Sequence, residues 1–568
     1  MCGIAGIIGN APQPQQTLRR MLDAQQHRGP DAAVQKHWAG KAALGHNRLS
    51  IIDLQESANQ PMASASGRYT IVFNGEIYNY IELRGELPQY HFVTQSDTEV
   101  LLAAVETWGI ERTLPKLNGM FSFGIYDAHE DTFWAARDRF GVKPFYYHTN
   151  GGVLWFASEP TTLFAAGIPK LPNNAVWASY FAHGHYGQPH QTFWQGIDQL
   201  PAGTLLKWQK GNLVMRPWYS FQETVEQLQQ QPNSHWEEEY RSLLKEAVEL
   251  RFRADVPVGF NLSGGLDSST LLALVNASFP GNSAIEAFTF TTGDERYDEL
   301  PWVQQMLQRT ANPLNVCQLN VEDVPALAAQ MSRHQMEPFG GFPTLAYSNL
   351  FKTARQKGVL VLLDGQGMDE AWAGYDYYTN NSGSVVQGVV GSPVFAEVLD
   401  GDFLRLAQQE QLPQPFDNRL QNLQFRDLFY TKIPRALRFN DRVSMMHSTE
   451  LREPFLDYRL VTLAFSQPEA LKIRDGQRKW MLRNIAREML GDTLALAPKR
   501  ALQTPQREWL AGPLADWAAA HIEKFSQMNW VDGKQVMAAW QRYRTGSADN
   551  SFYIWQWINA ALIFNSNE

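Results

Sequence analysis

Hydrophobic positions follow one spacing in the first two hundred residues and another in the rest of the chain. Short apolar runs at 71–73, 121–125 and 153–156 stand between Gly, Asn and Pro turns, a pattern that indicates β-strands. Helix-length stretches separate some of them, for example at 98–108. We therefore predict an α+β domain of stacked antiparallel sheets between helices over residues 1–215.

A polar, Gln-rich stretch at 226–232 lies where the spacing of hydrophobic positions changes, and we expect a linker over 216–232. Beyond it, the segment 237–252 repeats apolar residues at the spacing of one helix face, which predicts an amphipathic helix. The change in hydrophobic spacing therefore predicts a second domain, which we place at 233–568.

Three apolar segments of strand length follow, separated by helix-length segments, at 257–262, 287–292 and 359–363. Strands that alternate with helices form a parallel sheet covered on both faces. From about residue 372 the pattern is mostly helical, and we expect the Gly/Ser-rich stretch 380–393 to be a mobile loop. The second domain is thus predicted to be an α/β parallel-sheet domain with a helical C-terminal part.

Composition narrows the class of protein. A chain of 568 residues is too long for one ordinary core, which agrees with two domains. The net charge of −9 without a basic stripe argues against a nucleic-acid partner, and no apolar run approaches the roughly 20 residues of a membrane helix. The only cysteines, Cys2 and Cys317, cannot form a disulfide framework. We expect a cytoplasmic protein with no membrane partner, in which Cys317 packs as a small apolar residue.

Cys2 is a candidate nucleophile because it directly follows Met1. A small side chain at the second position permits removal of Met1, which would leave Cys2 with a free α-amine of pKa about 8. That amine can accept the thiol proton, so that one residue supplies both nucleophile and base. The glycines that follow let a substrate approach the backbone.

Six motifs in order resemble the class II glutamine amidotransferase domain, an N-terminal nucleophile fold. They are residues 1–4 (MCGI), 27–31 (HRGPD), 46–53 (HNRLSIID), 74–79 (NGEIYN), 96–99 (SDTE) and 137–144 (RDRFGVKP). One departure is that Asp31 is followed by Ala32-Ala33-Val34 where the family has a glycine. Six ordered matches make coincidence very unlikely, and the departure concerns loop geometry.

The resemblance implies a role for each of these residues. Cys2 attacks the side-chain amide of glutamine, and Asn74 with the N–H of Gly75 forms the oxyanion hole, where one donor is worth about 3 kcal/mol. Arg48 pairs with the glutamine α-carboxylate, while Glu76 and Asp97 hold its α-ammonium. The full glutamine-binding set that it implies is Arg48, Leu49, Ser50, Ile51, Ile52, Asn74, Gly75, Glu76 and Asp97.

A second candidate site follows the first strand of the parallel sheet. Residues 263–269 (SGGLDSS) lie between that strand and a predicted helix. Glycines at a strand-to-helix turn free backbone N–H groups to face an anion, and the helix N-terminus adds partial positive charge. The loop is therefore a phosphate cradle, although it lacks the Gly-x-x-x-x-Gly-Lys-Ser/Thr pattern.

This loop resembles the pyrophosphate loop of ATP-pyrophosphatases, which split ATP into AMP and pyrophosphate. Residues 361–370 (VLLDGQGMDE) and 373–375 (AGY) resemble the Ser-Gly-Glu-Gly-x-Asp-Glu element of glutamine-hydrolysing asparagine synthetases. The resemblance implies ATP as substrate and Mg²⁺ on Asp267 and Asp369. The ATP-binding set it implies is Leu262, Ser263, Gly264, Gly265, Leu266, Asp267, Ser268, Ser269, Thr289, Phe290, Asp364 and Gly365.

Gln366 departs from the family, which has a glutamate at this intermediate-forming position. A Gln amide takes no proton and carries no charge. Asp364 stands where the family has Ser and is our candidate to compensate. The departure leaves the reaction class intact and weakens the identification of aspartate as the acceptor.

Three later motifs extend the resemblance to about residue 510. They are residues 437–445 (LRFNDRVSM), 450–457 (ELREPFLD) and 477–483 (QRKWMLR). Within the last, Lys479 matches a lysine near the α-phosphate, where an ammonium offsets developing charge, and Arg483 is taken as structural.

We conclude that glutamine, ATP and a carboxylate acceptor, in the first instance aspartate, are the partners of a two-site enzyme. Ammonia made at Cys2 would cross a dry, apolar passage between the domains to an adenylated acid. Three alternatives stay open: amidation of another carboxylate such as a uronic acid or a peptide side chain, a lactam-forming synthetase, and a non-catalytic protein of the same fold. The sequence does not report the oligomeric state, a homodimer included.

Overall fold

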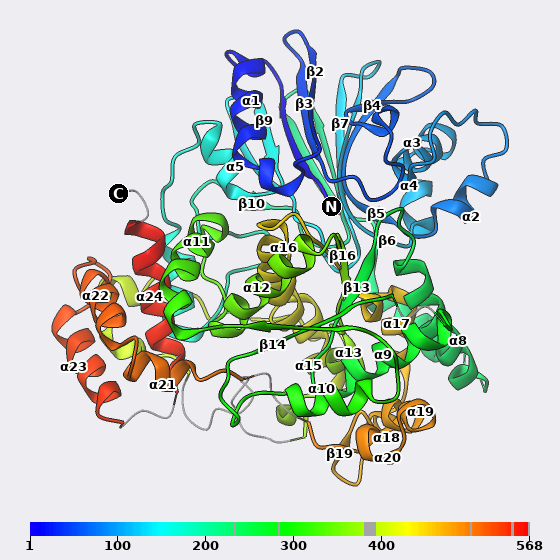
Figure 1. The fold of residues 1–568 in the computed structure, drawn as a ribbon. Coiled ribbons are helices and arrows are strands. Elements are labelled where there is room, and N and C mark those ends of the chain that lie inside the picture. Colours follow the sequence, from blue (N-terminus) through cyan, green and yellow to red (C-terminus); the bar gives the residue numbers. More distant parts are fainter. Residues whose placement is uncertain are drawn as a thin grey trace.

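The computed structural model describes residues 1–231, 234–281, 284–379, 393–409, 411–499, 503–546 and 550–565. Two six-stranded sheets and one five-stranded sheet dominate it, with the first two at the top of Figure 1 and the third below them. The predicted order of an antiparallel half followed by a parallel half is confirmed.

The N-terminal half consists of two antiparallel sheets packed face to face. The first has the strand order β10 (Asp198–Gln199), β8 (Tyr146–Asn150), β9 (Val153–Ala157), β1 (Gly3–Ile8), β3 (Ala42–Arg48), β2 (Ala32–Trp38). The second has the order β12 (Asn212–Pro217), β11 (Thr204–Gln209), β7 (Thr132–Arg137), β6 (Gly119–Asp127), β5 (Tyr69–Ile77), β4 (Met62–Ala63).

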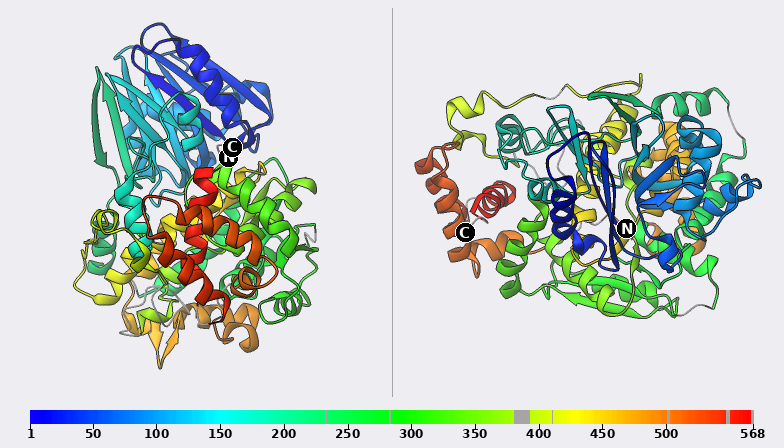
Figure 2. Two further views of the ribbon diagram at one scale, coloured as in Figure 1. Left: turned by 90° about the vertical axis from the view of Figure 1, so that its left-hand side faces the viewer. Right: turned by 90° about the horizontal axis from the view of Figure 1, so that it is seen from above.

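Alternating side chains explain this stacking. Ile4 and Leu44 of the first sheet and Val72 of the second are fully buried in one shared cluster, because successive residues of a strand point to opposite faces. The outer faces are covered by helices: α1 (Pro14–Ala24) packs on the first sheet and α3 (Asp97–Trp108) on the second. Figure 2 shows the two sheets seen edge-on beside each other.

The C-terminal half is built on a parallel sheet with the order β15 (Leu314–Gln318), β14 (Ala287–Thr291), β13 (Val258–Asn261), β16 (Val361–Leu363), β17 (Glu450–Arg452). The three predicted strands are its centre. The two outer strands, β15 and β17, were not predicted as strands. β17 is only three residues long and carries charges at both ends, so it offers no apolar run to find.

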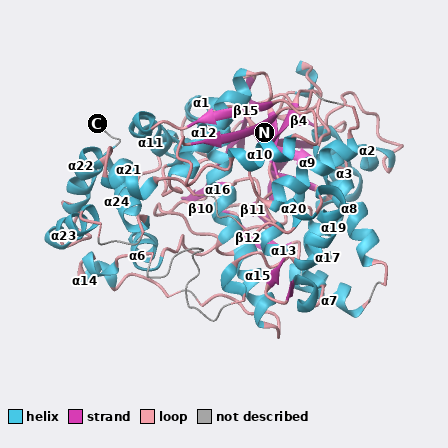
Figure 3. Cartoon of the chain, turned by 60° about the horizontal axis from the view of Figure 1, so that its bottom comes forward, coloured by secondary structure: helices cyan, strands magenta, loops and turns pink. Residues whose placement is uncertain are grey.

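Helices cover both faces of this sheet, as predicted. One face packs against α8 (Trp236–Arg251) and α9 (Leu266–Ser278), and the other against α12 (Phe342–Gln356) and α16 (Lys432–Met445). The other helices of eight or more residues in this half are α10 (Leu300–Leu307), α11 (Val324–Gln335), α15 (Arg419–Phe429), α17 (Tyr458–Ser466), α19 (Trp480–Leu490), α22 (Ala515–Ser526), α23 (Gly533–Arg544) and α24 (Phe552–Asn565), and the first half also contains α6 (Asn174–His183). Helices surround the sheet in Figure 3, and the last ones gather at one side of the molecule.

The stretch expected as a linker carries a helix, α7 (Phe221–Gln230), that packs on α17 and buries Phe221 and Val225. The domain boundary itself stays a prediction. The stretch 380–393 lies, except for its last residue, outside the described residues. Among the helices that are described, none combines the length and the apolar character needed to cross a bilayer.

Candidate functional site

Cys2 lies at the head of β1, where the first sheet meets β5 of the second sheet. Its backbone N–H donates to Asn74 Oδ1 at 3.0 Å, and its Sγ lies 3.8 Å from the carbonyl oxygen of Leu49. The side chain is buried, and this burial raises the pKa of the Cys2 thiol. The thiol therefore needs a nearby proton acceptor to become a nucleophile.

Asn74 and Gly75 occupy adjacent positions on β5 beside Cys2. The Nδ2 of Asn74 is buried without a hydrogen-bond partner, which is costly for an amide unless a ligand oxygen accepts from it. A Cβ on Gly75 would lie only 2.2 Å from the carbonyl oxygen of Met120, so the close strand contact excludes any larger residue. The sequence places an oxyanion hole here, and a free amide donor fits that expectation.

An acidic cluster of Glu76, Asp97 and Glu450 lies close to Asn74 and Gly75. Burial, and then repulsion by Glu450, raise the pKa of Glu76 well above its ordinary value, and burial raises the pKa of Asp97 to about 6. One oxygen of Glu76 has no partner, while Asp97 accepts from the N–H of Ile77 at 2.9 Å. Buried carboxylates in such a state favour a cationic ligand.

Two cations, the α-ammonium of Met1 and the guanidinium of Arg452, already contact this cluster. The α-ammonium of Met1 pairs with Glu450, and both side chains are fully buried. Burial opposes the ionisation of Glu450, but the ammonium and Arg452 outweigh it and lower its pKa to about 2. The Met1 side chain packs in the same cluster as Leu49, Ile51 and Ile52.

Arg48 lies at the end of β3 and is held by the loop that follows it. Its guanidinium donates to the carbonyl oxygens of Asp53 and Gln55 and to Asn59 Oδ1, the last at 2.9 Å. The neighbouring residue Ser50 donates its N–H to Asp31 at 2.8 Å. These contacts fix the loop in place, and pairing of Arg48 with a ligand carboxylate stays a prediction.

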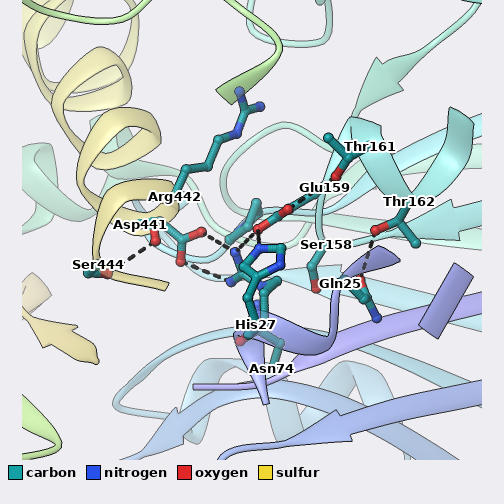
Figure 4. A network of polar contacts seen from close by, with 12 residues as sticks. Gln25, His27, Asn74, Ser158, Glu159, Thr161, Thr162, Asp441, Arg442 and Ser444 are labelled. Carbon is teal, nitrogen blue, oxygen red and sulfur yellow. Dashed lines mark hydrogen bonds and ion pairs between the residues drawn. The ribbon is translucent and has the colours of Figure 1, made fainter. Parts of the chain in front are cut away.

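A buried network around Arg28 ties the nucleophile to the second half. Arg28 donates to the carbonyl oxygen of Cys2 at 3.1 Å, to Glu159 at 2.8 Å and to Asp441 at 2.8 Å. Figure 4 shows Glu159 and Asp441 facing each other across this network. His27 contacts the same Glu159 at 3.1 Å. The backbone of Cys2 is thus positioned by residues from both halves, a connection that the sequence did not reveal.

The predicted phosphate cradle lies where β13 passes into α9. The N–H of Gly264 donates to the carboxylate of Glu299 at 3.0 Å, so this amide already faces an anion. Ser268 Oγ donates back to the carbonyl oxygen of Ser263 at 2.8 Å, and Ser269 Oγ donates to the carbonyl oxygen of Gly265 at 2.7 Å. The two serines stabilise the loop rather than projecting freely.

A cavity opens beside the cradle at the carboxyl ends of the parallel strands, where ligands of such sheets bind. Its walls include six residues predicted for ATP binding together with several that were not predicted. They are Leu262, Ser263, Ser268, Thr289, Phe290 and Asp364, with Asn261, Phe288, Tyr297, Asp298, Glu299, Tyr347 and Leu350. Six of the predicted residues line it, and Gly264, Gly265, Leu266, Asp267, Ser269 and Gly365 do not.

Asp267 and Asp369 converge on the same lysine. Lys479 Nζ lies 2.7 Å from both oxygens of Asp267 and 2.7 Å from Asp369. Lys499, which the sequence did not single out, lies 2.6 Å from Asp369. Burial raises the pKa of Asp267, whereas the two lysines outweigh burial and hold the pKa of Asp369 below its usual range.

These two carboxylates fit a magnesium ion that also binds substrate phosphates. Mg²⁺ takes oxygen ligands and is commonly held by one or two carboxylates plus phosphate. Here two carboxylates share one cation, the Lys479 ammonium. Among the described residues no group of three or more His, Cys, Asp or Glu side chains forms a metal cage, so a protein-only site is not the arrangement present.

Asp364 is the other notable carboxylate at the end of β16. Burial raises its pKa to about 6, and one of its oxygens is buried without a partner. Nearby, burial and then Asp369 raise the pKa of Glu370 to about 7, while Tyr375 donates to it at 2.7 Å. Gln366 is half-buried in the same turn. A titratable carboxyl is therefore present beside the position where the glutamate is missing.

One residue touches both candidate sites. The guanidinium of Arg452 on β17 lies 3.5 Å from Glu76, and its carbonyl oxygen accepts from the N–H of Asp364 at 2.9 Å. Sequence reasoning quoted the motif that contains Arg452 without giving it a role. That motif was the only sequence signal for Arg452, because β17 offers no apolar run.

Comparisons with known proteins agree with this geometry. A family model described as a glutamine amidotransferase domain matches residues 1–219, and one described as asparagine synthase matches residues 239–565. "Asparagine synthetase [glutamine-hydrolyzing] 1" of Bacillus subtilis is 27% identical, covering 98% of this chain and 95% of that protein. "Putative asparagine synthetase [glutamine-hydrolyzing] 2" of Methanocaldococcus jannaschii is 34% identical over 67% of this chain and 76% of that protein. "Amidase chyE" of Penicillium rubens is 27% identical, covering 90% of each chain.

Proposed function

The chain belongs to the asparagine synthase family, as a glutamine-hydrolysing ligase that uses ATP, and from this premise we propose that it converts aspartate to asparagine through an acyl-adenylate. Glutamine supplies the nitrogen, and the other products are glutamate, AMP and pyrophosphate. The observation that carries the proposal is Arg452, which contacts Glu76 at 3.5 Å and accepts from Asp364 at 2.9 Å. A residue shared by both sites favours coupled chemistry over two independent activities.

At the first site, Cys2 acts after removal of Met1. Its thiolate attacks the glutamine side-chain carbonyl carbon, and the oxyanion is held by Asn74 Nδ2 and the Gly75 N–H. The C–N bond then breaks and ammonia leaves, and water hydrolyses the thioester to glutamate. The α-ammonium of glutamine takes the place of the Met1 ammonium beside Glu76 and Glu450, which supports the assignment because that space already holds a cation.

At the second site, a carboxylate oxygen of the acceptor attacks the α-phosphorus of ATP, and pyrophosphate leaves. Ammonia then attacks the acyl carbon and AMP leaves. Lys479 offsets the charge that develops at the phosphorus, while Asp267 and Asp369 would hold Mg²⁺, which supplies charge neutralisation for the phosphates. We propose that Asp364 accepts the proton released by the attacking ammonia, since Gln366 cannot.

The ammonia would travel through the interface between the halves. A small cavity there is lined in one part by Tyr78, Met120, Phe140 and Leu456 and in another by the charged residues Asp138, Arg139 and Arg251. We propose that ammonia follows the apolar part. The lining also includes Glu453, whose pKa burial raises to about 8. This carboxyl is therefore mostly neutral at pH 7, which suits a passage for an uncharged molecule.

A direct assay tests the proposal. The protein is incubated with glutamine, ATP, Mg²⁺ and aspartate, and asparagine, AMP and pyrophosphate are quantified. Equal amounts of the three products support it. Formation of ADP, or pyrophosphate without asparagine, contradicts it. Omission of Mg²⁺ with added chelator is expected to abolish AMP formation but not glutamine hydrolysis.

A second candidate function is amidation of another carboxylate. It is favoured by Gln366 at the family's glutamate position and by a relative that is named an amidase. The same assay with a uronic acid and with a peptide bearing a carboxylate side chain distinguishes the two. The Gln366→Glu variant sharpens the test, because unchanged amide formation would show that this position is not chemically critical.

Two further proposals concern the cellular location and the oligomeric state of the enzyme. Cys2 and Cys317 are both free thiols, which supports a cytoplasmic location; fractionation of the native source tests it. A homodimer stays a prediction that sedimentation of the purified protein tests.

A further inference from the structure

A cavity of about 370 Å³ lies between the two halves. None of the residues predicted to bind glutamine or ATP lines it. Its volume falls in the range of small-molecule pockets, which begins near 300 Å³. The cavity meets the smaller one between the two sites through shared walls at Arg139, Phe140 and Val142.

The walls of this cavity are strongly basic. Arg137, Arg139, Arg435, Arg438 and Arg442 line it, and Asp441 is the single acidic side chain that the described residues contribute. Asp441 is already bound by Arg28 at 2.8 and 3.2 Å. A concave surface with this excess of positive charge concentrates anions.

Three of these arginines form one stripe on α16. Arg435, Arg438 and Arg442 follow one another at three and four residues, which places them on one helix face. The inner member, Arg442, is neutralised by Glu337 at 2.6 Å. Arg435 and Arg438 also line the cavity, and neither has a carboxylate as close as Glu337 is to Arg442.

Arg438 is buried yet incompletely paired. Its side chain is 9% exposed, and Nη1 approaches Glu337 only to 3.8 Å, beyond hydrogen-bond distance. That Nη1 atom is buried without a hydrogen-bond partner. For Arg435, no carboxylate within 4.0 Å is found in the part of the chain that the structure describes, and its guanidinium lies 5.9 Å from the ring centre of Tyr186.

The opposite side supplies further guanidinium groups and aromatic surface. Arg137 donates three hydrogen bonds of 2.7 Å to the carbonyl oxygens of Lys143, Leu200 and Gly141. It is held rigidly, and these partners do not cancel its charge. Aromatic side chains complete the lining: Phe140, Tyr186, Tyr219, Phe425 and Phe429.

We propose that this interdomain cavity binds a small molecule that carries an oxyanion, a carboxylate or a phosphate, on an aromatic or apolar body. Arg435 and Arg438 hold the oxyanion, because planar guanidinium groups match the geometry of carboxylate and phosphate oxygens. Tyr186 and Phe429 contact the body of the ligand. Since the walls come from both halves, the ligand bridges them.

Calorimetric titration at constant ionic strength tests this site in the full-length protein. The probes are phenyl phosphate and phenylacetate, with saturating AMP present so that the nucleotide site is blocked. We expect saturable one-to-one binding of at least one probe. Stronger binding of phenyl phosphate identifies a phosphate ligand, and stronger binding of phenylacetate identifies a carboxylate. Binding of neither probe overturns the proposal.

The variant Arg435→Gln/Arg438→Gln is expected to weaken binding at least tenfold. The matched control removes two exposed arginines, Arg19→Gln/Arg405→Gln, which are 63% and 74% exposed, and is expected to bind as the parent does. Equal affinity in the two double variants overturns the proposal. Arg435→Gln alone, which breaks no ion pair, provides the same comparison if the double variant does not fold. AMP formation in the assay above is a separate readout, so failure of this site and failure of the proposed function are distinguishable.

Discussion

The two candidate sites differ in how their buried carboxylates are balanced. At the glutaminase site, burial raises the pKa of Glu76 and Asp97, and one oxygen of Glu76 lacks a partner. At the ATP site, Lys479 lies 2.7 Å from both Asp267 and Asp369, and Lys499 lies 2.6 Å from Asp369. The first arrangement suits a ligand that brings its own ammonium, and the second suits a polyanion that needs cations supplied by the protein.

The largest effect is expected from a substitution at the glutaminase site. Cys2→Ala removes the nucleophile, so amide formation from glutamine should fall at least about 10⁴-fold. With ammonium salts as nitrogen source, amide formation should persist, because the second site is untouched. Both rates are measured from the amide product. Cys317→Ala is the matched control, and loss of the ammonia-dependent rate in Cys2→Ala would contradict the separation of the two sites.

The second-largest effect is expected from a substitution at the ATP site. Lys479→Met removes the ammonium shared by Asp267 and Asp369, which should lower both glutamine- and ammonia-dependent amide formation about 10³-fold. Glutamine hydrolysis should change little. Lys534→Met, at an exposed helix position, controls for loss of a lysine. A parallel fall in glutamine hydrolysis would show that the two sites are not chemically separate.

A smaller effect is expected at the oxyanion hole. Asn74→Ala removes the unpartnered Nδ2 donor, and the rate of glutamine hydrolysis should fall about 10²-fold. The Michaelis constant for glutamine should change less than the turnover number, because the donor acts on the developing oxyanion. Steady-state kinetics of glutamate release measures both. A change confined to the Michaelis constant would assign Asn74 to substrate binding instead.

The smallest effect concerns stability and pH. Burial raises the pKa of Asp364 to about 6, so the folded protein holds this proton more tightly than the unfolded chain does. Its ionisation therefore costs folding free energy as pH rises from about 4 to about 6, and the full cost, at most about 3 kcal/mol, is present above pH 6. Asp364→Asn should show less of this loss in denaturant titrations. An identical pH dependence of the free energy of unfolding in both proteins would exclude Asp364 as the titrating group.

Sequence patterns predicted the two sheet architectures and the residues near each site, because these features depend on short local stretches. The turn after β13 and the strand that carries Asn74 and Gly75 are local in this sense. The roles of Glu450 and Arg452 were not predicted, because β17 is a strand through its pairing with β16 and contains no apolar run. Lys499 lies 130 residues from Asp369, and no spacing rule connects them.

The contact between Arg28 and Asp441 has a mechanical consequence. If the two halves moved apart, Asp441 would lose the counter-charge of Arg28, while Arg28 would keep the carboxylate of Glu159. Leaving one member of a buried ion pair without its partner typically costs about 3–5 kcal/mol. The same guanidinium supports the backbone of Cys2, so such an opening would also disturb the nucleophile. Wide hinge opening is therefore disfavoured, and the distance between the two candidate sites is expected to stay nearly constant.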